Sequence, residues 1–89
     1  MPTLRLKIIN RLGLHARASA VLVQTFQKFK SEVWLSKSGQ TVNGRSILGV
    51  LTLAASQGEE IEVTAEGEDA DDLLTAARTL VANRFGEEA

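Results

Sequence analysis

Apolar and polar positions along this chain recur with different periods, and each period predicts a different element. Over residues 4–8 apolar side chains alternate with charged ones, which is typical of a strand buried on one face. After Gly13 the apolar positions recur at steps of three and four residues from Ala18 to Phe29. This spacing places them on one side of a helix, so we expect a strand followed by a helix.

The middle of the chain predicts a hairpin and a short helix. Alternation returns within residues 33–43, interrupted by a Ser-Gly pair that is typical of a turn between two strands. Residues 47–55 are too apolar to show a clear period. Because Ser46 before this run is a favourable N-cap and Gly58 lies just beyond its end, we expect a helix there.

The last third predicts another strand and a final helix. Apolar residues alternate with Glu and Thr over residues 61–65. The helix that follows is the clearest element, with Asp69 capping its start, Arg84 in its last turn and Gly86 after its end. Its apolar face is made of Leu73, Leu74, Ala77, Leu80 and Val81.

The order of these elements, βαββαβα, predicts the fold class. Strands whose apolar sides meet helices on one face imply an α+β sandwich with an antiparallel sheet. We therefore expect an open-faced sandwich, in which three helices cover one face of a four-stranded sheet. A chain of 89 residues is expected to form a single domain over residues 1–89.

The absence of cysteine and the presence of a single histidine limit the possible chemistry. They exclude a disulfide framework, thiolate metal sites and cysteine nucleophiles, and they argue against a histidine-rich metal site. We expect neither a metal nor a cofactor. No targeting segment is visible, and the longest apolar stretch, residues 47–55, is about half the length that spans a bilayer. A cytoplasmic location without membrane insertion is expected.

The formal net charge of −1 hides a strong asymmetry between the two halves of the chain. Residues 1–46 hold eight basic residues against one acidic residue, a charge of +7, whereas residues 47–89 hold two against ten, a charge of −8. Such a split predicts partners of defined charge or, alternatively, two solvated faces that attract each other.

Residues 10–19 break a rule that the last helix obeys. His15 falls at the start of the predicted helix, so Arg17 lies in its first turn. A cation at this end opposes the helix dipole at a cost of a few tenths to about 1 kcal/mol, which suggests a functional reason for its presence. Free N–H groups, the positive end of the dipole and a guanidinium converge there, as in anion sites.

The imidazole of His15 adds a nucleophile to this predicted anion site. Two positive sources beside the ring disfavour its charged form, so we expect it to be neutral at pH 7. A neutral imidazole can accept a phosphoryl group, whose charge the anion site would bind. No partners for a complete reaction are apparent, which indicates a relay protein rather than an enzyme. The alternative is that His15 only caps the helix or lies on the surface.

Two segments resemble signatures of the HPr family, the histidine-containing phosphocarriers of the bacterial phosphoenolpyruvate-dependent phosphotransferase system. Residues 12–18, Leu-Gly-Leu-His-Ala-Arg-Ala, are similar to the active-site signature. Residues 42–50, Val-Asn-Gly-Arg-Ser-Ile-Leu-Gly-Val, are similar to the signature around the family's regulatory serine. The resemblance extends over essentially the whole chain.

The resemblance implies a phosphoryl relay. Enzyme I, phosphorylated from phosphoenolpyruvate, would pass a phosphoryl group to Nδ1 of His15, which would hand it to the A component of a sugar-specific enzyme II. Arg17 and the backbone N–H groups of Ala16 and Arg17 would stabilise the phosphate. The protein itself is expected to be a monomer.

Two departures from the family pattern affect these expectations. The family usually has proline at the position of Ala18, and proline suits a first helical turn through its fixed φ, so the start of this helix is expected to be softer. Gln24 and Gln27 stand where many relatives carry lysine, which predicts a weaker basic rim facing acidic partners.

Ser46 has a structural and a functional interpretation. As an N-cap it is worth about 1 kcal/mol. It also resembles the target of the ATP-dependent HPr kinase/phosphorylase, whose phosphate would add about −1.5 to −2 charge beside Arg45. We expect the helix to survive this modification and the added charge to repel an acidic enzyme I.

The resemblance also implies a docking surface on the helix after Ser46 and the helix after His15. We expect part of the trio Ile47, Leu48 and Leu51 to be exposed near Ala20, although the same residues could be plain core.

Other functions are consistent with the same element order. A module that binds small molecules or RNA is one alternative, but the chain has only four aromatic residues, and no adjacent pair of them on strands for base stacking. A nitrogen-branch paralogue, which would regulate rather than feed transport, stays open.

Overall fold

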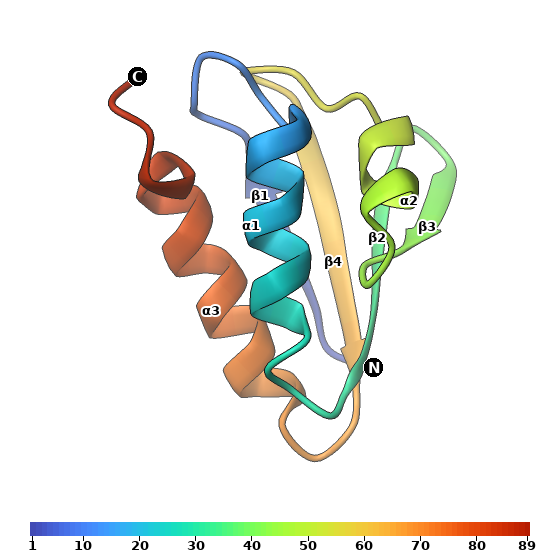
Figure 1. Cartoon of the computed structure of the whole chain (residues 1–89). Coiled ribbons are helices and arrows are strands. Elements are labelled where there is room, and N and C mark those ends of the chain that lie inside the picture. The colour runs from blue at the N-terminus through green and yellow to red at the C-terminus, as the bar shows by residue number, and fades with distance from the viewer.

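Four strands pair into one antiparallel sheet in the order β1-β4-β2-β3 (Figure 1). The central strand β4 is antiparallel to both β1 and β2, so β1 and β2 run parallel to each other. Parallel strands need a crossover connection, which explains why a helix separates β1 from β2 in sequence. In the computed structural model, which describes residues 1–89, the strands are β1 (Thr3–Lys7), β2 (Glu32–Lys37), β3 (Gln40–Asn43) and β4 (Glu60–Glu66).

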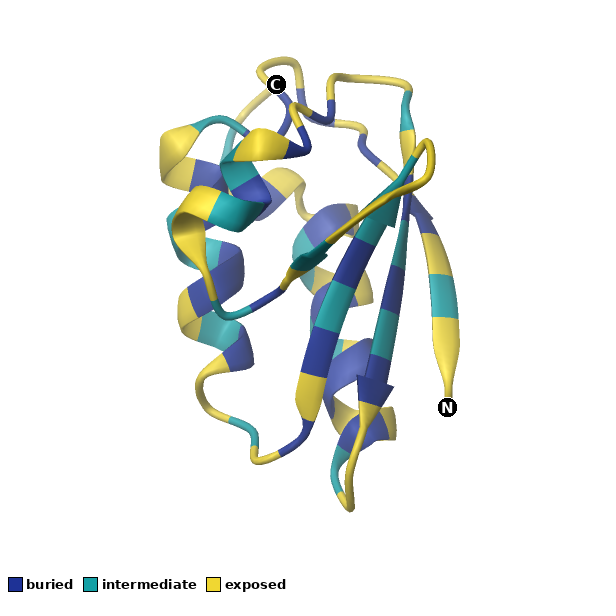
Figure 2. Ribbon diagram, turned by 90° about the vertical axis from the view of Figure 1, so that its right-hand side faces the viewer, coloured by how far each residue is buried: buried dark blue, intermediate teal, exposed yellow.

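Three helices cover one face of this sheet and leave the other face open (Figures 1 and 2). The predicted α+β open-faced sandwich with the order βαββαβα is therefore confirmed. None of the helices is both long and apolar enough to cross a membrane. The helices are α1 (Ala16–Phe26), α2 (Ile47–Thr52) and α3 (Ala70–Ala82), and α3 is followed by a short 3-10 turn, η1 (Arg84–Gly86).

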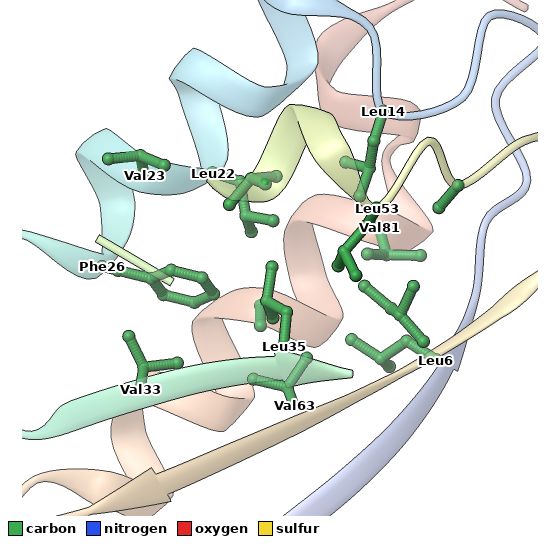
Figure 3. Close-up of a cluster of buried hydrophobic side chains, with 14 of the residues drawn as sticks. Leu6, Leu14, Leu22, Val23, Phe26, Val33, Leu35, Leu53, Val63 and Val81 are labelled. Carbon is green, nitrogen blue, oxygen red and sulfur yellow. The ribbon is translucent and has the colours of Figure 1, made fainter. Parts of the chain in front are cut away.

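In β1, β2 and β4 every second side chain points under the helices, and Figure 2 shows the resulting change of burial along β2 and β4. Leu35 of β2 lies opposite Val63 of β4, and both are fully buried. Phe26 and Leu22 of α1 cover the same region of the sheet (Figure 3). One continuous cluster of 21 buried hydrophobic residues results.

Two helices end earlier than their apolar patterns predict. The helix α1 ends at Phe26, and Phe29 packs against the core from the following turn. The helix α2 ends at Thr52 rather than at residue 55, because Ala54 has a positive φ of 50° that is incompatible with a right-handed helix.

The start of α3 differs from its predicted cap. Asp69 occupies the N-cap position, but its carboxylate makes no bond to the helix. It accepts hydrogen bonds from the backbone N–H of Lys30 at 2.8 Å and of Ser31 at 2.9 Å, and from the Ser31 hydroxyl. Hydrogen bonds from Ser31 and Lys30 hold the pKa of this carboxyl below its usual value, although desolvation opposes them. Asp69 thus fastens α3 to the turn after α1.

The helices α1 and α3 run in opposite directions, so the start of α1 and the end of α3 lie at the same end of the molecule (Figure 1). At this end, Arg84 and Phe85 both adopt a positive φ of 55°. Arg84 is therefore outside α3 rather than in its last turn. The two residues turn the chain back toward the loop that precedes α1.

Candidate functional site

His15 lies at the junction between the loop after β1 and the first turn of α1. Its backbone is extended, with φ −74° and ψ −178°, and occupies the N-cap position. Its carbonyl accepts the first helical hydrogen bond, from the N–H of Ser19 at 2.9 Å. The imidazole makes no capping bond and its side chain is 28% exposed. His15 therefore occupies the N-cap position through its backbone and not through its side chain.

Gly13 sets the direction of the chain as it enters the site. Its φ of +65° is in the left-handed region, and a Cβ there would overlap the carbonyl oxygen of Ala55. The same carbonyl accepts a hydrogen bond of 2.9 Å from the N–H of Leu14, the residue before His15. The loop before α1 is thus held against the segment after α2 at a distance that only glycine permits.

The N–H groups of Ala16, Arg17 and Ala18 make no backbone hydrogen bond within the protein. They are the free donors that a helix N-terminus presents. Arg17 is exposed and its guanidinium makes no ion pair, so its charge is available beside the same helix end. Because Ala18 stands where the family usually has proline, this chain presents one additional N–H at the first turn.

The carboxylate of Glu87, which no sequence pattern predicted as a site residue, contacts the imidazole directly. Its Oε2 pairs with Nε2 of His15, and its Oε1 accepts a hydrogen bond of 2.9 Å from Nδ2 of Asn10. A negative group therefore lies beside the ring in addition to the two positive sources that were predicted. Glu87 and His15 are 72 residues apart, a contact that no local pattern could reveal. The one available signal was the topology, which brings the residues after Gly86 to the start of α1.

The side chain of Glu87 is only 9% exposed. Desolvation raises the pKa of this carboxyl, but the hydrogen bonds from Asn10 and His15 and the charges of His15 and Arg17 outweigh it, so the pKa lies below its usual value.

Asn10 is fully buried and connects the loop to the C-terminal segment. Its Nδ2 donates to the Gly13 carbonyl at 2.8 Å as well as to Glu87. Its Oδ1 has no hydrogen-bond partner, which costs about 1–3 kcal/mol for a buried polar atom. This unpaired oxygen lies where the loop before α1 meets residues 86–89.

The segment after α3 is anchored on both sides of Glu87. Phe85 is buried in the core, and the N–H of Arg11 donates to the backbone oxygen of Ala89 at 3.0 Å. The left-handed conformations of Arg84 and Phe85 are unfavourable for residues with a side chain. A hollow of about 480 Å³ remains beside His15, lined by Arg11, Leu12, Arg17 and residues 86–89.

Ser46 caps α2 as predicted, since its Oγ accepts a hydrogen bond of 3.0 Å from the N–H of Gly49. The residue is exposed. The neighbouring guanidinium of Arg45 does not face Ser46, because it donates to the carbonyls of Phe29 and Ser31, at 2.8 Å in the second case. Arg45 therefore braces the turn after α1.

The residues expected in a docking surface differ in exposure. Leu48 is 76% exposed and Ile47 is 42% exposed, whereas Leu51 and Ala20 are half-buried. Leu12, at 66%, is a further exposed apolar residue next to the site. No group of three His, Asp, Glu or Cys side chains is placed to hold a metal ion.

Comparisons with known proteins agree with this geometry. The family model for the PTS HPr component phosphorylation site matches residues 3–83. The phosphocarrier protein HPr of Xylella fastidiosa strain Temecula1 is 52% identical over 93% of each chain. The crystal structure of HPr-C-His from Thermoanaerobacter tengcongensis superposes over 100% of each chain with a TM-score of 0.96 and 40% identity. A crystal structure of an HPr dimer from the same organism, also 40% identical, covers 98% of this chain and 100% of that one with a TM-score of 0.78.

Proposed function

The chain belongs to the HPr family of phosphocarrier proteins, and from this premise we propose that it accepts a phosphoryl group on Nδ1 of His15. The donor is phospho-enzyme I and the acceptor is an A component of a sugar-specific enzyme II. The protein acts as a stoichiometric carrier in this relay rather than as an enzyme.

The observation that carries this proposal is the free Nδ1 atom at the start of α1. Nδ1 of His15 has no hydrogen-bond partner in the protein, whereas Nε2 is occupied by Glu87. A phosphoryl group on Nδ1 would be next to the helix end where the N–H groups of Ala16 and Arg17 have no acceptor. These donors and the Arg17 guanidinium supply the positive field that a transferring phosphoryl group requires.

Enzyme I and phosphoenolpyruvate, mixed with the purified protein, test the proposal. We expect one acid-labile phosphoryl adduct on the wild-type chain and none on His15→Ala. An adduct of equal yield on His15→Ala would refute the role of His15. Sugar-type and nitrogen-type A components supplied separately then identify the branch, and transfer only to the nitrogen type would overturn the sugar assignment.

Partner docking is proposed for the exposed apolar surface beside the site. Ile47 and Leu48 project from α2, and Leu51 and Ala20 are half-buried nearby. This apolar patch lies on α2 and on α1, whose first turn holds the exposed Arg17, and the combination suits acidic partners that each bury a small area in turn. Leu48→Ser is expected to raise the KM that enzyme I shows for this protein, while the variant stays folded. An unchanged KM would argue against docking on this surface.

Regulation at Ser46 is proposed on the same surface. Its hydroxyl is exposed at the start of α2, where HPr kinase/phosphorylase would reach it. Arg45 is engaged with the turn after α1, so the added charge would remain largely uncompensated beside Ile47 and Leu48. Phosphoserine at this position is expected to slow transfer from enzyme I through repulsion of an acidic partner. An unchanged transfer rate would contradict this.

A further inference from the structure

The two nitrogens of the His15 ring have different surroundings. Nε2 pairs with Oε2 of Glu87, whereas no protein group binds Nδ1. The second oxygen of Glu87 accepts from Asn10 at 2.9 Å, so both oxygens of the carboxylate are fixed. Asn10 in turn holds the Gly13 carbonyl at 2.8 Å, which makes the carboxylate part of the loop that carries His15.

We propose that Glu87 is a positioning residue for phosphoryl transfer, because it holds the proton on Nε2 and leaves the lone pair of Nδ1 available to the incoming phosphorus. This inference rests on the proposed function, since it concerns how His15 accepts the group. A carboxylate that accepts from one imidazole nitrogen fixes both the tautomer and the orientation of the ring.

The transfer of the phosphoryl group to Nδ1 releases no proton from the imidazole. The lone pair of Nδ1 forms a bond to phosphorus, and the bond between phosphorus and the donor atom breaks with its electron pair leaving on the donor. The proton stays on Nε2, so the phosphorylated ring becomes cationic. Glu87 opposes this new charge at the nitrogen where the proton remains, as a carboxylate does for an imidazolium in hydrolytic triads.

The fold places Glu87 here at a conformational cost. Arg84 and Phe85 adopt left-handed backbone conformations in succession, and the ring of Phe85 is buried. The backbone oxygen of Ala89 accepts from the N–H of Arg11 on the far side of Glu87. These anchors hold the carboxylate against His15 from both directions along the chain.

The tautomer of His15 gives the first test, by the imidazole ¹⁵N chemical shifts of the unphosphorylated protein. Glu87→Gln removes the charge and keeps the shape, and Glu88→Gln is the matched control because Glu88 is exposed and its carboxylate makes no ion pair with the protein. We expect the Nε2–H tautomer to dominate in the wild type and in Glu88→Gln, and to lose population in Glu87→Gln. Identical shifts in all three proteins would overturn the proposal.

The initial rate of phosphoryl acceptance from enzyme I gives the second test. Loss of a group that orients a histidine costs about 10–100-fold in activity in metal sites, and we expect at least tenfold slower transfer to Glu87→Gln with Glu88→Gln within about twofold of wild type. Equal slowing in both variants would indicate a long-range charge effect and overturn the proposal. A changed tautomer with an unchanged rate would overturn it as well.

These outcomes separate the proposal from the function on which it rests. If the wild-type chain accepts no phosphoryl group, the proposed function fails and the role of Glu87 fails with it. If the wild-type chain is phosphorylated on His15 and Glu87→Gln is phosphorylated equally fast, only the role of Glu87 fails.

Discussion

Single residues in the loop before α1 determine where the His15 ring can stand. The spacing of His15, Ala16 and Arg17 at a helix start was enough to predict an anion site with a nucleophile. Asn10 and Glu87 were not predictable, because one is an ordinary polar residue in a loop and the other is 72 residues from His15. Local sequence describes the helix end, whereas the contact that distinguishes Nδ1 from Nε2 depends on tertiary structure.

Substitution of Gly13 by alanine should destabilise the fold more than substitution of Gly39, although both glycines have a positive φ. Gly39 also has a positive φ, of 84°, but nothing lies within 4 Å of the place where its Cβ would be. Both Gly→Ala variants pay for the left-handed backbone, and Gly13→Ala adds a clash with Ala55, for about 1–3 kcal/mol more. Urea unfolding of the two variants measures the difference. Equal losses would mean that the loop can move away from Ala55 freely.

Arg17 is expected to act on the transferred group rather than on the fold. Its guanidinium makes no hydrogen bond or ion pair with the protein, so Arg17→Ala should leave the unfolding midpoint almost unchanged. Removal of one preorganised positive donor costs roughly 10²–10³ in the rate of a step that develops negative charge. Arg11→Ala, which removes the same charge from the rim of the same hollow, is the control. If Arg17→Ala and Arg11→Ala slow phosphoryl transfer equally, the loss reflects weaker electrostatic attraction of the partner protein and not a contact between Arg17 and the transferred group.

At the scale of helices and strands, the sequence patterns predicted β2, β4 and α3 correctly but misplaced the ends of α1 and α2. The alternation of β2 and β4 and the period of α3 survive in the structure because each element buries one continuous side. The predicted ends of α1 and α2 were wrong, since apolar residues beyond a helix can enter the core from a turn. Phe29 and Leu53 do so, and periodicity alone cannot distinguish them from helical residues.

The stability of α2 should depend on the hydroxyl at its start. The helix has six residues and buries only Val50 within its span, so the cap formed by Ser46 is a large share of its local stabilisation. Ser46→Ala is expected to lower the free energy of unfolding by about 1 kcal/mol, and Ser46→Thr by less, because threonine keeps the acceptor. Denaturant titration compares them. A neutral Ser46→Ala would show that packing against α1 alone holds this helix.

On the scale of the whole molecule, the two oppositely charged halves of the sequence meet in the sheet. Arg5 pairs with Glu62 across β1 and β4 at 3.1 Å, and Lys37 pairs with Glu59 at 3.1 Å. The predicted attraction between the halves is therefore present, although exposed pairs of this kind contribute little stability. Arg11 and Arg17, next to the start of α1, make no such pairs, which leaves their charges available to partners.

Acid should destabilise the fold through the carboxyls of Glu59, Asp69 and Glu87, whose pKa values are lowered in the folded state. A lowered pKa stabilises the fold above the unfolded value, 4.5 for the glutamates and 3.8 for Asp69, and this stabilisation is lost as pH falls through the lower folded value. We expect the urea midpoint to be steady near neutral pH and to fall below about pH 4.5.

Asp69→Asn checks the origin of this acid sensitivity. It should be less stable than the wild type at neutral pH, and the difference should shrink as pH falls from 3.8, the unfolded value, through the lower folded pKa of Asp69. Asp71→Asn removes an equal charge from an exposed position in the same helix and should lose less. A difference that stays constant with pH would mean that Asp69 acts by shape and not by charge.

The atom that receives the phosphoryl group tests the account most directly. The ¹⁵N-labelled protein is phosphorylated with enzyme I and phosphoenolpyruvate, and coupling between phosphorus and each imidazole nitrogen of His15 is measured by NMR. We predict coupling of phosphorus to Nδ1, with Nε2 still protonated. Phosphorus on Nε2, or on any residue other than His15, would contradict the account.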